Sequence, residues 1–354
     1  MYSESDLQAA VDARVLTPEA AAAFRSHIAS VRAAPGADEE HFRLITGFND
    51  IFVSIAAVIL LVAVAWIGEA IHTALAGAFV AASAWFLAEY FTRKRRMALP
   101  SIVLMLAFAG GVAATMIGFL VEHGEALFGR SPSDTVGALL AGGIALVTAA
   151  ATWLHWRRFM VPITVAAGTA ALAATAVALI LSLTGVPQNS PTLVMMLVLV
   201  AGLGVFALAM WWDRSDRVRQ TRRSDVAFWL HLLAAPMIAH PIFHLLGVTQ
   251  GDNISSGAAT MVVVIYIVFG LIALAIDRRA LLVSALAYVL FALTQLFQTF
   301  GAVELNVALT AFVIGSALLL LSAFWQNARA AVVGMLPVHL ASQLPATISS
   351  QPAS

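Results

Sequence analysis

Cysteine is absent from the 354-residue sequence, and charged residues occupy only 11% of its positions. The absence of cysteine excludes disulfide bonds, iron–sulfur clusters, thiolate zinc sites and a cysteine nucleophile. The charged fraction is far below the roughly 25% of soluble domains, so there are too few polar side chains to cover a water-soluble fold. Because hydrophobic residues make up 61% of the chain, we expect the lipid bilayer to be the solvent for most of its surface.

Sequence signatures of common enzymes and pumps are also missing. No glycine-rich phosphate loop, catalytic-triad signature or His-Glu-x-x-His zinc-protease motif occurs in the sequence. These absences argue against an ATP-driven pump and give no indication of an enzyme. The formal net charge of zero likewise gives no indication of a nucleic-acid partner.

What the chain has instead is a series of apolar runs of about 20 residues, the length that a helix needs to cross ~30 Å of hydrocarbon. We count ten runs and predict an all-α, polytopic transmembrane helical bundle, with a tight turn at Glu69-Ala70 between the first two. Strands do not fit, because strands of membrane barrels alternate in polarity and these runs are continuous. The predicted spans are Ile51–Gly68, Ile71–Phe91, Ala98–Val121, Thr135–Trp156, Met160–Thr184, Thr192–Trp212, Val226–Val248, Ala258–Ile276, Ala280–Phe300 and Val303–Trp325.

The basic residues are distributed unequally over the two sides of these segments. Of the 19 Lys and Arg residues, Arg130 is the only one on the side where the odd-numbered segments end. Lys and Arg are retained in the cytoplasm during membrane insertion, so we predict that both termini are cytoplasmic. A missed or extra span in the middle would destroy the asymmetry, so the charges also support an even number of helices.

The polar segment ahead of the first span has no apolar run long enough for a signal peptide, which makes the first span an uncleaved anchor. Apolar residues recur every four positions in Leu7–Val15, and Thr17-Pro18-Glu19 places a capping residue and a proline at the start of a second helix. We therefore predict two short antiparallel helices, followed by a linker at Ala33–Glu40.

These observations divide the chain into three parts. Residues 1–45 are the predicted cytoplasmic helical pair and linker, residues 46–326 the ten-helix transmembrane domain, and residues 327–354 a cytoplasmic tail. Because apolar residues cluster at Val332–Leu336, we expect the tail to rest on the membrane surface before a disordered polar end.

The span Val226–Val248 is the least ordinary, because it holds three histidines and two prolines. His240 and His244 are four residues apart and share a helix face, while His231 lies about half a turn round. Pro236 and Pro241 lack a backbone N–H, and Pro241 in particular is expected to kink the helix. These residues are our candidate site for a proton relay, a divalent metal or a substrate. The alternative is that each histidine bonds a neighbouring helix or lies near the headgroups.

A haem held by two histidines is a further option for this span. Partners at matching depth are His231 with His155, and His240 with His72. The sequence does not establish that these helices are neighbours, so haem and divalent metals are low-priority hypotheses and no cofactor is predicted.

The N-terminal region carries a family resemblance. Leu7, Val15 and Thr17-Pro18-Glu19-Ala20, followed by Phe42-Arg43-Leu44-Ile45-Thr46-Gly47-Phe48-Asn49-Asp50 before the first span, resemble a family of uncharacterised bacterial membrane proteins grouped as a domain of unknown function. The likeness covers the helical pair, the linker and the multi-span body. It implies a bacterial inner-membrane setting and transfers no activity or site residue.

Two classes of function remain open. One is transport of a small solute, with the histidine-bearing helix lining the path, because ten helices exceed what anchoring needs. The other is a non-catalytic scaffold or regulatory protein that binds a cytoplasmic partner through residues 1–45. The scarcity of charge within the spans favours the scaffold, and the oligomeric state is open.

Overall fold

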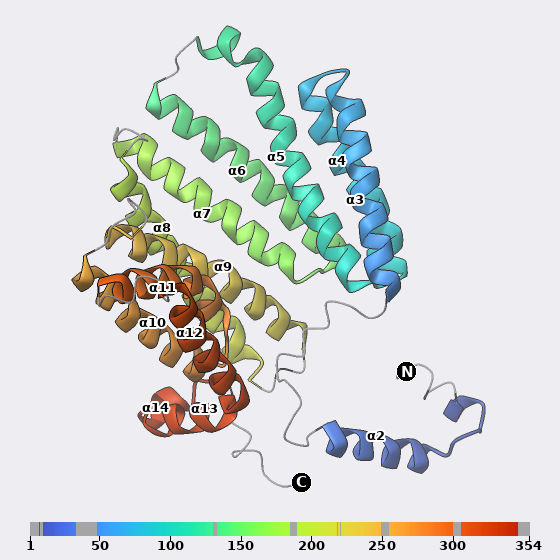
Figure 1. Cartoon of the computed structure of the whole chain (residues 1–354). Coiled ribbons are helices and arrows are strands. Elements are labelled where there is room, and N and C mark those ends of the chain that lie inside the picture. The colour runs from blue at the N-terminus through green and yellow to red at the C-terminus, as the bar shows by residue number, and fades with distance from the viewer. Residues whose placement is uncertain are drawn as a thin grey trace. The chain divides into compact units, whose positions relative to one another are not determined.

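The computed structural model describes residues 7, 10–32, 48–129, 133–184, 190–217, 219, 221–248, 255–299 and 306–345. Over these residues the structure contains helices and no strand, which confirms the predicted all-α class. The chain divides into two compact units, Met1–Leu44 and Ile45–Ser354. Figure 1 labels the helices of both units in chain order.

The first unit contains α2, Pro18–Arg32, which begins where Thr17-Pro18-Glu19 predicts a helix. The Thr17 hydroxyl oxygen accepts a hydrogen bond from the Ala20 backbone N–H at 3.1 Å, as expected of a residue that caps a helix. Residues 10–12 ahead of α2 are also helical. The predicted linker Ala33–Glu40 lies outside the described residues.

The second unit has one long apolar helix in each of the ten ranges predicted as spans. The helix α4 continues directly into a short π-helix, η1, Glu89–Lys94. The bounds of the ten helices are α3 Phe48–Glu69, α4 Thr73–Ala88, α5 Ala98–Phe128, α6 Asp134–Phe159, α7 Ile163–Thr184, α8 Pro191–Ser215, α9 Arg222–Leu245, α10 Ser256–Ile276, α11 Ala280–Thr299 and α12 Asn306–Ala323.

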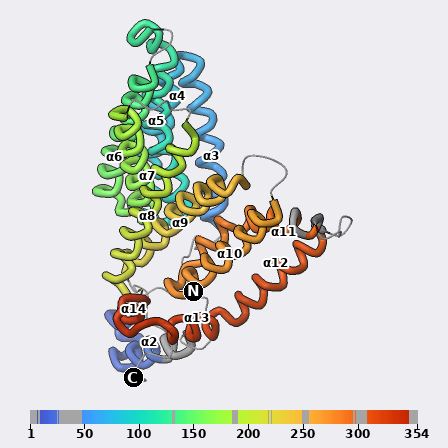
Figure 2. Tube along the Cα trace, turned by 90° about the vertical axis from the view of Figure 1, so that its left-hand side faces the viewer, coloured from blue at the N-terminus to red at the C-terminus, as the bar shows by residue number. Residues whose placement is uncertain are grey.

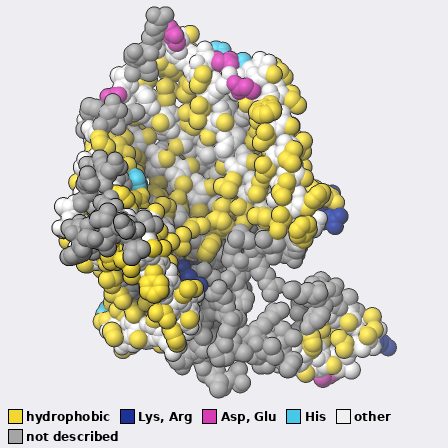
Figure 3. Space-filling model, viewed as in Figure 1, with side chains coloured by type: hydrophobic (Ala, Val, Ile, Leu, Met, Phe, Trp, Pro, Cys, Tyr) yellow, Lys and Arg dark blue, Asp and Glu magenta, His cyan; other side chains and the backbone are white. Residues whose placement is uncertain are grey.

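The length and hydropathy of these helices make the chain a multi-pass integral membrane protein. Eight of them, α3 to α10, are long and apolar enough to cross a membrane. The helix α12 reaches that length only together with α13, Trp325–Gly334, and the two are bent by 78° relative to each other. The helix α11 is apolar but shorter over the part whose side chains are described. Hydrophobic side chains cover the flank of the bundle in Figure 3. Ten crossings therefore stay a prediction.

The first hairpin turns as tightly as Glu69-Ala70 predicts. The helix α3 ends at Glu69, and α4 begins at Thr73 behind His72, whose Nδ1 accepts a hydrogen bond from the Ala74 N–H at 3.1 Å. Within the hairpin a methyl group on Gly68 would lie 2.5 Å from the Leu75 carbonyl oxygen. Glycine is therefore needed for the two helices to meet at the turn.

The helices α4 and α5 approach each other through their backbones. A methyl group on Gly77 would lie 2.5 Å from the Gly111 carbonyl oxygen, and one on Gly111 would lie 2.7 Å from the Ala81 nitrogen. Gly118 repeats this contact against Thr73 and Ala74 at the start of α4. Small residues serve this purpose in membranes because lipid gives apolar side chains little reason to associate with one another.

The helix α9 is the most enclosed of the eight spans. In its most apolar window 56% of the residues are buried, against 17% to 33% in the other seven. It packs against α8 and also against α7 and α11. Where α8 crosses α9, a methyl group on Gly202 would lie 2.9 Å from the Met237 carbonyl oxygen. This carbonyl also lacks its usual helical hydrogen bond, because Pro241 has no N–H to donate.

The two ends of the helices differ in charge. The basic end is where α4, α6, α8 and α10 finish; it holds the Lys and Arg side chains of η1, of the last turn of α6, and of the α8–α9 and α10–α11 connections. The opposite end, called here the acidic end, holds Glu69, Glu122, Glu125 and Asp134. In Figure 3 acidic side chains, together with some of the histidines, lie along the upper edge of the bundle.

The chain folds back at the basic end after α12. Figure 2 shows α13 turning off the line of α12 toward α14, Val338–Ala341. Trp325 and Arg329 of α13 are 4% and 0% exposed, while Met335 is 83% exposed. The predicted surface-lying tail therefore includes a folded part, residues 325–345, and residues 346–354 lie outside the described range.

We predict that Gly111→Ala lowers the thermal unfolding temperature of the purified protein in detergent, whereas Gly110→Ala leaves it unchanged or raises it. The added methyl at position 111 would overlap backbone atoms of α4, and overpacking costs about 1–3 kcal/mol. At position 110 no described atom lies within 4 Å of that methyl, and alanine is the better helix former. Equal effects of the two substitutions would contradict the close α4–α5 contact.

Candidate functional site

The carboxylate of Asp213, near the end of α8, is buried against α9 and the α10–α11 connection. Its Oδ2 lies 2.9 Å from His231 Nε2, and its Oδ1 accepts a hydrogen bond from Arg278 Nη2 at 2.7 Å. The three side chains are between 1% and 4% exposed. We call these residues the Asp213 network; it joins segments that lie 18 and 65 residues apart in sequence.

Arg278 reaches Asp213 because the chain reverses sharply after α10. Asp277 ends the helix in the left-handed conformation, with φ of 57°, which Asp and Asn adopt more readily than most residues. Arg278 then faces the first turns of α9, where its Nη2 donates to the Ser224 carbonyl at 3.2 Å and its guanidinium lies 6.0 Å from the Phe228 ring. The α10–α11 connection is thereby fixed to α9.

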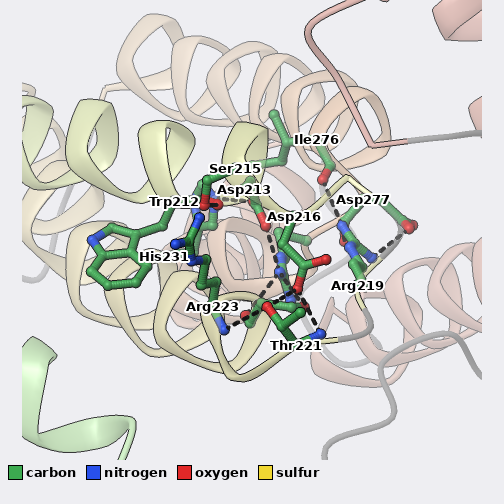
Figure 4. Close-up of polar contacts among 12 residues, drawn as sticks. Trp212, Asp213, Ser215, Asp216, Arg219, Thr221, Arg223, His231, Ile276 and Asp277 are labelled. Atoms are coloured by element: carbon green, nitrogen blue, oxygen red, sulfur yellow. Dashed lines mark hydrogen bonds and ion pairs between the residues drawn. The ribbon is translucent and has the colours of Figure 1, made fainter.

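A second buried carboxylate, Asp277, binds three more side chains, shown in part in Figure 4. Arg219 Nη1 donates to its Oδ2 at 2.8 Å, and Trp325 Nε1 donates to its Oδ1 at 2.7 Å. Arg329 Nε lies 3.7 Å from the same Oδ1. Burial, aided by the charge of Arg278, lowers the pKa of Arg219, while Asp277 acts in the opposite direction. These four residues are the Asp277 network.

The α8–α9 connection and the tail close over these two networks. Asp216 Oδ2 accepts hydrogen bonds from the Thr221 N–H at 2.8 Å and from the Thr221 hydroxyl at 2.7 Å. The tail returns to the same place, because Arg217 Nε donates to the Leu344 carbonyl at 3.0 Å and Arg329 Nη2 donates to the Pro345 carbonyl at 2.7 Å. The basic end is therefore an ordered structure that links α8, α9, α10 and α13.

Of the predicted site residues, His240 and His244 are brought together and His231 is not. His240 Nδ1 is hydrogen-bonded to the hydroxyl of Tyr288 on α11, and the His244 ring lies 6.4 Å from that of His240. His231 faces Asp213 instead. The helix continues from Arg222 to Leu245 through Pro236 and Pro241, so both prolines lie within α9.

The histidines considered for haem have separate neighbours. His155 is buried among Trp85, Phe108 and Phe159, with its Nδ1 3.3 Å from the Thr164 hydroxyl. His72 lies at the acidic end, where its Nε2 is 2.6 Å from Glu122 Oε2. These neighbours differ from those of His231 and His240, and neither proposed haem pair shares a contact among the described residues.

The charged side chains of the basic end lie beyond the predicted spans, as expected, but several of them are buried, which the sequence did not indicate. Asp213, Asp277, Arg278 and Arg329 are each less than 5% exposed. Sequence reasoning placed them at helix ends and counted the arginines only as markers of orientation. The signal that could have found them is the presence of acidic residues in loops otherwise dominated by arginine. Arginines that face water need no acidic partner, so acids in these loops indicate ion pairs that are buried.

Comparisons of the chain with protein-family models, with curated proteins and with solved structures return no match.

We predict that Asp213→Asn strongly lowers the thermal unfolding temperature of the purified protein. Arg278 would stay buried without the carboxylate that balances its charge, a loss on the order of 3–5 kcal/mol. The double variant with Asp213→Asn and Arg278→Gln should recover part of this loss, because both charges are then removed. Thermal unfolding followed by gel filtration measures each variant.

Glu89→Gln is the matched control for this prediction. Glu89 pairs with Arg158 at 2.6 Å, but the two side chains are 29% and 40% exposed. Water compensates exposed charges, so this substitution should lower the unfolding temperature much less. An equal decrease for Asp213→Asn and Glu89→Gln would show that the burial of Asp213 has no energetic consequence.

Proposed function

We propose that the protein transports a small solute across the membrane and that α9 is the helix around which its two access states interchange. The observation that carries this proposal is the Asp213 network, in which one buried carboxylate is shared by a histidine and an arginine from different segments. Ionisable side chains are costly within membrane proteins and commonly mark ion or substrate pathways.

The charge of the Asp213 network depends on one proton. With His231 neutral, the charges of Asp213 and Arg278 balance. With His231 protonated, the buried group carries a net positive charge, which is costly at such low exposure. Binding of an anion, or movement of Arg278 toward water, would restore the balance. Protonation of His231 would therefore drive α9 and the α10–α11 connection apart.

The rest of α9 supports the same role. His240 and Tyr288 place a second polar contact nine residues beyond His231, about 13 Å along a helix. Pro236, between these two contacts, and Pro241, directly after His240, each remove one backbone hydrogen bond from α9. A central helix with polar groups at two depths and weakened bonding between them is suited to bending during transport.

The setting of the protein is part of the proposal. Lys and Arg side chains at the basic end favour its placement in the cytoplasm, with the α13 segment on the same side. The resemblance of the N-terminal region to uncharacterised bacterial membrane proteins favours the bacterial inner membrane.

Charge movement in reconstituted membranes tests transport without a known substrate. Vesicles that contain the purified protein would be adsorbed to a solid-supported electrode and exposed to pools of amino acids, sugars, nucleosides, organic acids and inorganic ions. We expect one pool to give a transient current whose size changes with pH. The variant His231→Gln should keep a hydrogen bond to Asp213 but lose the pH dependence, because an amide does not titrate.

The control is His339→Ala, which removes an exposed histidine of α14 and should leave the current unchanged. Each variant must elute and unfold as the unmodified protein does. Absence of current with every pool, or an unaltered pH dependence in His231→Gln, would overturn the proposal.

A second candidate function rests on the first unit. We propose as the alternative that residues 1–45 bind a cytoplasmic protein while the spans serve as a scaffold. The first unit is compact by itself, and Val15 and Leu16 ahead of α2 are 77% and 37% exposed. Exposed apolar side chains beside a helix are common points of protein contact.

We predict that Val15→Asp in the full chain removes proteins that co-purify with it, because a carboxylate cannot enter an apolar interface without cost. The neighbouring Arg14→Lys preserves charge and should have no effect. Quantitative mass spectrometry of the purified membrane complexes compares the variants. An unchanged set of proteins with Val15→Asp would eliminate the scaffold role for this surface.

A further inference from the structure

A cluster of three side chains that could bind a metal lies at the acidic end, far along the chain from the Asp213 network. His72 precedes α4, and Glu122 and His123 belong to the final turns of α5. Their ligand atoms all lie within 4.8 Å of one another. The shortest of these separations, from His72 Nε2 to Glu122 Oε2, is 2.6 Å.

Each of the three side chains is also held by a contact outside the cluster. The Ala74 N–H donates to His72 Nδ1 at 3.1 Å, and the Thr73 N–H donates to Glu122 Oε1 at 2.9 Å. His123 Nδ1 lies 3.3 Å from the Phe119 carbonyl oxygen, and its ring stacks on Phe119 at 4.6 Å. The contacts of Glu122 and His123 can persist when an ion binds, so these two side chains have little freedom left to lose.

The helices beneath the cluster are fixed as well. A methyl group on Gly118 would lie 2.7 Å from the Thr73 carbonyl carbon, so the start of α4 and the end of α5 are in backbone contact. The rings of His72 and His123 stack across this contact at 5.6 Å. The relative position of the three ligands is therefore set by packed helices, which hold a metal site more accurately than loops do.

We infer that His72, Glu122 and His123 form a binding site for one divalent transition-metal ion, with Zn²⁺ as the ion that fits best. Two imidazoles and one carboxylate are a ligand set of open zinc sites, in which water or another molecule completes the coordination. The side chains of His72 and Glu122 are 33% and 32% exposed, so the ion would stay accessible to water. Such a site would load reversibly from solution.

The surroundings favour a cation. Glu69, Glu125 and Asp134 lie at the same end of the helices, whereas the described Lys and Arg side chains of the second unit lie at the basic end. This separation lowers the electrostatic cost of bringing a doubly charged ion to the cluster. When the ion binds His72 Nε2, it displaces the proton that lies between Nε2 and Glu122 Oε2. That proton moves to His72 Nδ1, which then no longer accepts the Ala74 N–H.

Calorimetric titration of the chelator-treated full-length protein with zinc chloride tests the site. We expect one ion per chain, and at least about tenfold weaker binding for His72→Asn, Glu122→Gln and His123→Gln. The variant His72→Asn is the sharpest, because asparagine is a preferred residue at a helix N-cap and still accepts the Ala74 N–H. It removes the metal ligand and keeps the start of α4.

Two controls make the outcome specific. The double variant His240→Ala with His244→Ala, and His339→Ala, should bind zinc as the unmodified protein does. Zinc should also raise the unfolding temperature of the unmodified protein and leave that of His72→Asn unchanged, since only a ligand that binds the folded state stabilises it.

Three results would overturn the inference. They are no zinc binding by the unmodified protein at micromolar concentration, equal binding by His72→Asn, and loss of binding in the His240 and His244 double variant. The last result would place the metal on α9 instead.

Discussion

The buried carboxylate of Asp213 is the contact on which the second half of the bundle depends. It neutralises Arg278, and Arg278 in turn fixes the α10–α11 connection to the first turns of α9. Asp277, the residue before Arg278, then lies where Arg219, Trp325 and Arg329 can reach it. Removing one charge from such a set leaves others unpaired, so the two networks are expected to form or fail together.

The two halves of the transmembrane unit are held by different means. In the first half, α4 and α5 meet through Gly77, Gly111 and Gly118, where backbones touch. In the second half, ion pairs at the basic end tie α8, α9, α10 and α13. Both kinds of contact determine which helices are neighbours. Apolar side chains alone cannot do so, because they pack equally well against lipid.

The spans could be predicted from the sequence because hydropathy is a local property. Each of the ten apolar runs became a helix, and the Glu69-Ala70 turn formed where it was expected. The last predicted span ends at Trp325, where the chain bends by 78° between α12 and α13, but the size of this bend could not be predicted. Composition records that a segment prefers lipid and does not record where its axis turns.

The candidate site could be predicted only in part, for a physical reason. Helical periodicity separated His231 from His240 and His244, and the structure gives them different partners. The partner of His231 could not be found, because Asp213 lies 18 residues away on another helix and Arg278 lies 65 residues from Asp213. Arg278 indicates the orientation of its loop, and it also neutralises the buried Asp213. Only the packing of α8, α9 and the α10–α11 connection reveals the second role.

The position of α9 connects the two kinds of packing. One end is fixed by Arg278 and Asp213, and its centre is pressed against Gly202 of α8 at Met237. Beyond Met237, Pro241 leaves the helix without one backbone hydrogen bond just before His244 and the end of the helix. A helix that is anchored at one end and weakened toward the other bends more easily than it slides. Any motion that couples the histidines should therefore tilt the His240 half of α9 while the His231 half stays in place. The His231 half should move only when the Asp213 network gains or loses a proton.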